Sequence, residues 1–318
     1  MFDIIINPAG ASGRSLKYWQ KAETVFRSSH VPYTVHYSSE TESIASIVRN
    51  LTCSHENRNL VIAGGDGTMN QAVNSLMDFE HTKVGFLPCG SGNDLARALH
   101  MPSDALENAQ RILQGNVIRR MDVGEVIYLN RSNILQDEEL SEDGFVHHRF
   151  LISTGAGFDA AICQQVAVSK AKEALNKVHL GKLIYIGVAV KLIARQKTVP
   201  AWITFDGKTR EADRMLLAVC MNEPYEGGGF MFCPKASGND GKLDYCFGDS
   251  ISHADFFRIF PYAYKGNHVK FNGVYTGSMK EMEIRTEEPV WIHTDGEVSC
   301  MSNHVRMHLL DTKLAMMN

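Results

Sequence analysis

The sequence has few of the features that would assign it to several large protein classes. Its 318 residues include seven cysteines, scattered and without a C-x-x-C pair, so neither a disulfide framework nor a cysteine zinc site is expected. No run reaches the roughly 18 apolar residues of a membrane-spanning helix. The amino-terminus also lacks the basic start and long apolar core of a signal peptide. We therefore expect a cytoplasmic protein with reduced thiols.

The charge balance gives no reason to expect a nucleic-acid partner. Lys and Arg number 32 and Asp and Glu 36, a net charge of −4, so no overall basic field attracts a polyanion. One segment differs, because seven basic residues lie between Val168 and Val199 against a single acidic one, Glu173. Interleaved basic and apolar residues are typical of a peripheral membrane contact. A helix pair with a solvated basic face is the alternative.

Strands and helices alternate through the first third of the chain. Short apolar runs rich in β-branched residues predict strands, and apolar residues at helical spacing predict the helices between them. Such alternation predicts a parallel sheet with helices on its faces, which binds ligands at the carboxyl ends of its strands. The expected strands are 2–6, 33–37, 60–63 and 84–87, and the expected helices are 15–29, 41–51, 93–99 and 105–113.

The pattern changes after Asp122, where strand-like runs dominate. Asp206-Gly207 and Asp295-Gly296 have the composition of hairpin turns. This half is therefore predicted to be a mostly antiparallel β domain, built as a sandwich. The expected strands are 123–128, 149–153, 201–205, 214–221, 243–247, 282–285 and 290–293.

Four consecutive predicted strands end in small or polar residues. The third reads LVIAGGDGTMN, in which Gly64 and Gly65 interrupt the apolar run. Thr68 with Gln71 fits a capping box, which predicts that a helix starts at Thr68. Backbone N–H groups at such a turn favour an anion such as phosphate, although any α/β protein can contain a tight turn of this kind. Four such turns at one sheet edge predict a lined nucleotide cleft, and the other three are Asn7 to Gly13, Tyr37 to Ser39 and Pro88 to Asp94.

These motifs resemble those of the diacylglycerol kinase catalytic-domain family, the lipid kinase group that also includes sphingosine and ceramide kinases. The Gly64–Thr68 element is shared with NAD kinases and, distantly, with phosphofructokinases, so alone it indicates only the superfamily. The Gly90–Arg97 element is much more typical of the lipid kinases. The resemblance spans nearly the whole chain in the right order, with further matches at Asn7-Pro8, Asp122 to Gly124, Asn239 to Asp244 and Asp295 to Glu297.

The resemblance implies a two-domain fold. Residues 1–122 would form a Rossmann-like parallel sheet with helices, and residues 123–303 an antiparallel β-sandwich for the lipid substrate. The chain end, about residues 304–318, would return to the first domain. The active-site cleft would lie between the two domains.

The resemblance also implies roles for single residues. Asp66 and Asp94 would join a carboxylate, water and magnesium network beside the phosphates, and Glu297, with Asp295 beside it, would accept the proton of the lipid hydroxyl. A separate structural Mg²⁺ would bind the carbonyls of Ser237 and Lys242 and the side chain of Asp240. Gln71 stands where family members often have Glu, which removes a charge there. ATP would contact Asn7, Pro8, Ala9, Gly10, Ser12, Gly13, Ser39, Gly64, Gly65, Asp66, Gly67, Thr68 and Ser91.

The implied activity is an ATP- and Mg²⁺-dependent lipid kinase that converts diacylglycerol to phosphatidic acid. A kinase for a sphingoid base, another lipid alcohol or NAD, and a non-catalytic nucleotide-binding regulator, are the alternatives. Since diacylglycerol lies in a bilayer, we expect peripheral membrane association, with Lys170–Lys197 as the contact. A homodimer and a monomer both stay open.

Overall fold

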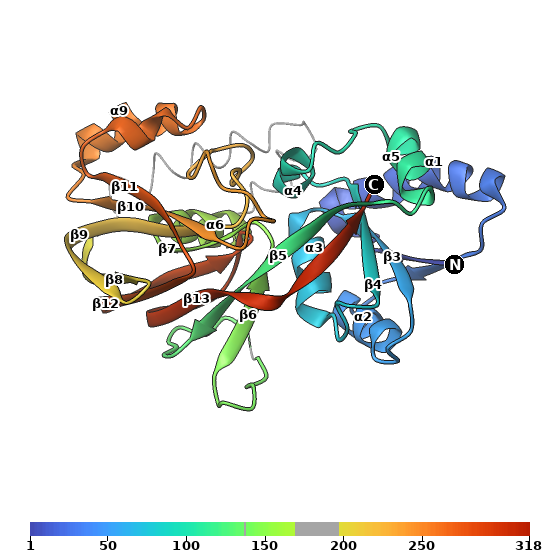
Figure 1. The fold of residues 1–318 in the computed structure, drawn as a ribbon, viewed down its shortest axis with the longest axis horizontal. Coiled ribbons are helices and arrows are strands. Elements are labelled where there is room, and N and C mark those ends of the chain that lie inside the picture. The colour runs from blue at the N-terminus through green and yellow to red at the C-terminus, as the bar shows by residue number, and fades with distance from the viewer. Residues whose placement is uncertain (137, 169–196) are drawn as a thin grey trace. The chain divides into compact units, whose positions relative to one another are not determined.

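The computed structural model describes residues 1–136, 138–168 and 197–318. They form two compact units, which Figure 1 shows as a ribbon: Met1–Val123 with Asp311–Asn318 is unit 1, and Gly124–Leu310 is unit 2. Within the described ranges no helix is long and apolar enough to cross a membrane. Residues 170–196 of the segment predicted to contact a membrane lie outside these ranges.

Unit 1 is built on a parallel sheet in the hydrogen-bonded order β2–β1–β3–β4–β13. All five residues of β1 and the last five of β3 are buried, as expected for strands covered on both faces. The strands are β1 (Phe2–Ile6), β2 (Tyr33–Tyr37), β3 (Arg58–Gly64), β4 (Thr82–Pro88) and the end of β13 (Glu297–Met317).

The helices of unit 1 begin at recognisable caps and bury an apolar face. Ser43 accepts a hydrogen bond from the Ser46 N–H at the start of α2, and the Asp104 carboxylate caps α5 in the same way. Trp19 and Phe26 of α1 are fully buried against the sheet. The elements are η1 (Gly10–Gly13), α1 (Arg14–Ser29), α2 (Ile44–Thr52), α3 (Asp66–Ser75), α4 (Asp94–Ala98) and α5 (Ala105–Leu113).

Unit 2 is mostly antiparallel. Its strands follow the order β11–β10–β9–β7–β12–β13, β8 pairs with β9 and β12, and β5 pairs with β6 and β13. Both predicted hairpin turns are present, with positive φ at each Asp and each Gly. Its elements are the end of β5 (Val117–Tyr128), β6 (Val146–Phe150), β7 (Ser153–Gly157), α6 (Phe158–Val168), β8 (Val199–Phe205), β9 (Lys208–Met221), β10 (Leu243–Asp249), α9 (His253–Ala263), η2 (Asn267–Lys270), β11 (Val274–Met279) and β12 (Glu281–Thr294).

The predicted fold class, a parallel α/β part followed by an antiparallel β part, is confirmed. The single strand predicted over residues 149–153 is wrong, because β6 ends at Phe150 and β7 begins at Ser153. The physical reason is that the Asp295 carboxylate accepts the backbone N–H groups of Leu151 and Ile152, which a sheet neighbour would otherwise take.

Candidate functional site

The two glycine turns that follow β3 and β4 pack directly against each other. A Cβ added to Gly90 would lie 2.7 Å from the Gly65 Cα, and one added to Gly65 would lie 3.1 Å from the Gly90 Cα. The Cys89 N–H also donates to the Gly64 carbonyl at 2.9 Å. Glycine is therefore required at this contact for close approach of two backbones. The structure thus brings together two of the four turns that were predicted to line one nucleotide cleft.

The helix after the first of these turns begins earlier than predicted. Gly65 is the N-cap of α3, and the N–H groups of Thr68 and Met69 both bond to its carbonyl. The capping box predicted for Thr68 is therefore wrong, since Thr68 is buried within the first turn. The N-terminus of α3 nevertheless follows the glycine turn directly. Backbone N–H groups at such an end favour a phosphate.

Asp66 cross-links the two turns. Its carboxylate accepts the backbone N–H of Asp94 at 3.2 Å and that of Leu95 at 3.3 Å. Asp94 is buried and its own carboxylate pairs with Arg97. The predicted pair Asp66 and Asp94 is therefore brought together at the carboxyl edge of the sheet. Oxygen donors of this kind suit a cation that keeps several of its waters, as Mg²⁺ usually does.

The turn after β1 is connected to the turn after β4 by Arg14, a residue that was not predicted from the sequence. The Arg14 guanidinium, at the start of α1, donates to the Ser91 hydroxyl at 3.0 Å. Ser15 donates to the Gly10 carbonyl at 3.1 Å, and the Cys89 thiol lies 3.3 Å from its hydroxyl oxygen. Arg14 directly follows the predicted Asn7 to Gly13 turn, and this position in the sequence could have identified it as a candidate phosphate contact. An arginine held there suits a phosphate oxygen.

Ser39 and Ser12 are two further residues that were predicted to contact the nucleotide. The Ser39 hydroxyl accepts the Glu42 N–H at 3.1 Å, which stabilises the turn after β2. The side chain of Ser12 lies outside the described residues. The ATP-binding roles of both stay predictions.

In unit 2 the Asp295–Gly296 turn is held by the Asp295 side chain. Its carboxylate accepts three backbone N–H groups, those of Leu151 at 3.0 Å, Ile152 at 2.8 Å and Ser153 at 3.0 Å. Glu297 follows the turn as the first residue of β13 and is exposed. Asp295 thus anchors the turn, and the exposed Glu297 follows directly after it.

The predicted structural metal site lies in a turn of unit 2. The Asp240 carboxylate accepts the Lys242 N–H at 3.0 Å, and the Ser237 carbonyl accepts the N–H groups of Asn239 and Asp240 at 2.8 and 3.3 Å. Carbonyl and carboxylate oxygens suit Mg²⁺. However, hydrogen bonds within the turn already use the Ser237 carbonyl, so the metal role stays a prediction.

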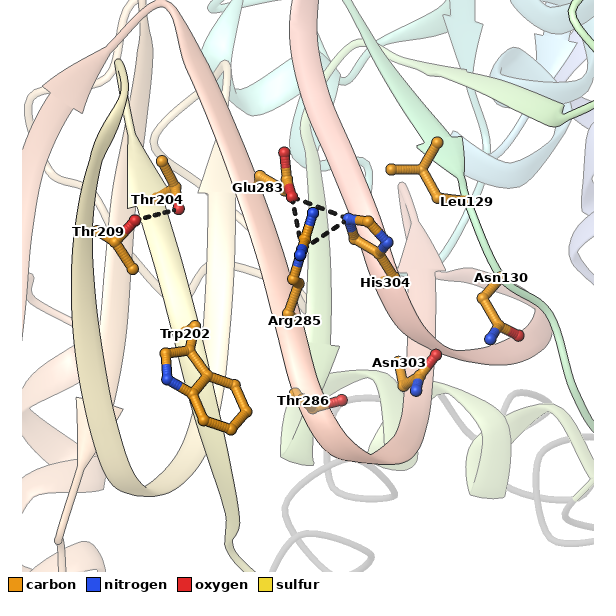
Figure 2. Close-up of a pocket in the computed structure, with 10 residues that line it drawn as sticks. All are labelled: Leu129, Asn130, Trp202, Thr204, Thr209, Glu283, Arg285, Thr286, Asn303 and His304. Atoms are coloured by element: carbon orange, nitrogen blue, oxygen red, sulfur yellow. Dashed lines mark hydrogen bonds and ion pairs between the residues drawn. The ribbon is translucent and has the colours of Figure 1, made fainter.

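A pocket of about 830 Å³ opens on unit 2, and none of the predicted site residues lines it (Figure 2). Glu283 accepts hydrogen bonds from the Arg285 Nε and from the His304 ring, both at 2.8 Å. Glu283 and Arg285 alternate along β12 with buried Met282 and Ile284, and His304 lies opposite Arg285 on β13, so these groups belong to the outward face of the sheet.

Comparison with known proteins gives consistent matches over both units. The diacylglycerol kinase catalytic domain matches residues 2–126, and the YegS C-terminal NAD kinase beta sandwich-like domain matches residues 153–314. A diacylglycerol kinase of Staphylococcus carnosus is 24% identical over 296 residues, 92% of this chain and 87% of that protein.

Solved structures show the same fold. The crystal structure of a diacylglycerol kinase from Bacillus anthracis matches with a TM-score of 0.67 at 20% identity, over 99% of this chain and 95% of that one. An NAD kinase from Archaeoglobus fulgidus, in complex with ATP, matches with a TM-score of 0.50 at 10% identity, over 100% and 94%.

Proposed function

Because the chain belongs to the diacylglycerol kinase catalytic-domain family, we propose that it transfers the γ-phosphoryl group of ATP to the hydroxyl of diacylglycerol. The products are phosphatidic acid and ADP. The observation that carries this proposal is the pair of turns packed at Gly65 and Gly90 and cross-linked by Asp66. Phosphoryl transfer depends on positioned phosphates, a cation and an aligned nucleophile, and a rigid pair of turns supplies the first.

In the proposed reaction Glu297 is the base. The lipid hydroxyl gives its proton to the Glu297 carboxylate while its oxygen forms a bond to the γ-phosphorus, and the bond between that phosphorus and ADP breaks. Glu297 suits this role because it is exposed beside a turn that Asp295 fixes. Mg²⁺, when bound, would neutralise phosphate charge, with Asp66 and Asp94 as the residues that would hold its waters.

Membrane contact is part of the proposal, because diacylglycerol lies in a bilayer. The segment Lys170–Lys197 combines basic and apolar residues, a composition that binds anionic lipid surfaces. We assign the peripheral contact to it on sequence alone.

The main rival is a kinase for a different acceptor. The similarity to an NAD kinase fold makes NAD a rational acceptor to test, together with sphingoid bases and other lipid alcohols. A nucleotide-binding regulator without activity is the second rival. The predicted carboxylates disfavour it, because a regulator needs no base.

The test is a phosphorylation assay with purified protein, γ-labelled ATP, Mg²⁺ and mixed micelles of dioleoylglycerol. Labelled phosphatidic acid is expected at the full rate from the wild type and only at a small residual rate from Glu297→Gln. The matched control is Glu287→Gln, which removes another exposed carboxylate of unit 2 and should leave the rate unchanged. If ATP binds but no lipid is labelled, diacylglycerol is not the acceptor, and the same assay is run with NAD and other alcohols.

A further inference from the structure

Three ionisable side chains meet in the interior of unit 2, and none of them was among the site residues predicted from the sequence. They are His293 near the end of β12, Asp159 in the first turn of α6, and Glu226 in the loop between β9 and β10. The His293 Nε2 lies 2.9 Å from an Asp159 oxygen and 3.3 Å from a Glu226 oxygen. His293 is 0% exposed, Asp159 5% and Glu226 7%.

Burying such a cluster is unfavourable unless its members satisfy each other. One Asp159 oxygen, Oδ1, has no hydrogen-bond partner among the described residues. The backbone also makes room for the cluster, because a Cβ at Gly155 would lie 2.1 Å from the Asp159 Oδ2 and 2.7 Å from the His293 Nε2. Apolar side chains of similar volume would stabilise the fold about as well as this buried ionic cluster. The cluster therefore points to a functional role for the His293 imidazole.

The other side of the imidazole ring contacts the turn that carries Glu297. The Gly296 N–H donates to the His293 Nδ1 at 3.2 Å. Gly296 lies between Asp295 and Glu297, so the turn is held at two points: by the Asp295 carboxylate and by the His293 ring. Because Nδ1 is the acceptor, the ring proton lies on Nε2, between the two carboxylates.

The groups around the ring act on its protonation in opposite directions. Burial lowers the pKa of His293, whereas the carboxylates of Glu226 and Asp159 beside Nε2 raise it. The Gly296 N–H bonds to the Nδ1 lone pair, and this contact favours the neutral ring with its hydrogen on Nε2.

The same cluster also ties down a glycine loop. Glu226 opens it, and the N–H of Phe230 returns to the Glu226 carbonyl at 2.8 Å. Gly227, Gly228 and Gly229 between them all have positive φ. The side chain of Glu226 thus fixes this loop to the same ring that holds the turn.

We propose that His293 is a positioning residue, which holds the Gly296 N–H and thereby fixes the Glu297 carboxylate for proton abstraction. Asp159 and Glu226 orient the ring through Nε2. This inference rests on the proposed function, in which Glu297 is the base. His293 itself touches no reacting atom.

Two substitutions separate the two sides of the ring. In His293→Asn the amide oxygen can replace Nδ1 as acceptor, whereas in His293→Gln the amide nitrogen can replace Nε2 as donor to the carboxylates. We expect His293→Gln to lower kcat about tenfold or more with KM for ATP unchanged, and His293→Asn to retain the larger part of kcat. Rates are normalised to the fraction of protein that binds ATP, so loss of folded protein does not mimic the effect.

A double-mutant cycle tests the connection to Glu297. In a Glu297→Gln background, His293→Gln should lower the residual rate no further, because the group that it positions is absent. Equal losses in His293→Asn and His293→Gln, or fully additive losses in the cycle, would overturn the proposal.

A readout without activity separates this inference from the proposed function. Hydrogen exchange of the Gly296 amide should be faster in His293→Gln than in the wild type and close to the wild type in His293→Asn. If the wild type phosphorylates no lipid, the proposed function fails, and the amide exchange still decides whether His293 holds the turn. Unchanged exchange in His293→Gln would refute the positioning role.

Discussion

Replacing Gly90 by Ala should damage nucleotide binding more than it damages the fold. The added Cβ would lie 2.7 Å from the Gly65 Cα and 2.8 Å from the Asn93 Oδ1, and ordinary contact begins at 3.4 Å. The two turns must therefore move apart by about 0.7 Å, since neither backbone can rotate away as a side chain can. Overpacking of this kind destabilises by about 1–3 kcal/mol.

The displacement acts on the turns that are proposed to hold the phosphates. We expect the Kd for ATP, measured by calorimetry, to rise about tenfold, which corresponds to about 1.4 kcal/mol. Gly65→Ala should have a smaller effect, because its Cβ would lie 3.1 Å from the Gly90 Cα and needs a shift of only a few tenths of an ångström. The order of the two variants thus follows from their distances.

Gly144→Ala is the control. Its Cβ would meet nothing within 4 Å, but its φ of +83° disfavours a side chain, so it should lose about 1–2 kcal/mol of stability and bind ATP normally. An ATP affinity of Gly90→Ala equal to the wild type, or a larger loss in Gly65→Ala than in Gly90→Ala, would refute the reasoning.

Three further outcomes are expected. Asp66→Asn keeps one oxygen for the two N–H groups that the carboxylate now accepts, so urea unfolding should show a loss of about 1–3 kcal/mol together with a lower kcat; unchanged stability would contradict the cross-link. The backbone N–H of His81 holds the pKa of Asp78 well below its usual value. Because the pKa of Asp78 is lower in the folded state, the ionised carboxylate stabilises the fold at pH values above its unfolded-state pKa of about 4. This stabilisation is lost as the pH falls below that value. The urea midpoint should therefore decline more below about pH 4 in the wild type than in Asp78→Asn, and parallel curves would contradict this. Replacing three lysines by Glu should weaken sedimentation with anionic vesicles and leave ATP binding unchanged, and unaltered sedimentation would remove the proposed membrane contact; the three are Lys177, Lys182 and Lys191.

Elements with strong local signals were predicted well. The helices expected at 15–29 and 105–113 are found at Arg14–Ser29 and Ala105–Leu113, because an apolar stripe that includes Trp19 and Phe26 packs on the sheet as its spacing indicates. The start of α3 was misplaced because Thr68 and Gln71 have the spacing of a capping box, whereas Gly65 takes the N-cap without a side chain.

Elements that depend on tertiary contacts were missed. Helix α6 is apolar over most of its length and lacks a polar face that would mark a helix, and α9 contains Pro261, which argues against a helix at that point. No local sequence pattern indicated the cluster of Asp159, Glu226 and His293. Its members lie on a helix, a loop and a strand, and about 67 residues separate each member from the next. Only the folded β part brings them together.

The four carboxylates predicted to be catalytic are not equivalent in the structure. Asp66 accepts two backbone N–H groups, Asp295 accepts three, and Asp94 is buried against Arg97. A proton added to any of these would displace a donor that stabilises the ionised form, so each suits a fixed negative charge or an anchor better than a base. Glu297 is exposed at the start of β13, next to the turn that the Asp295 carboxylate holds. In the proposed mechanism, therefore, Asp66 and Asp94 hold charge, Asp295 and His293 hold the turn, and Glu297 accepts the proton.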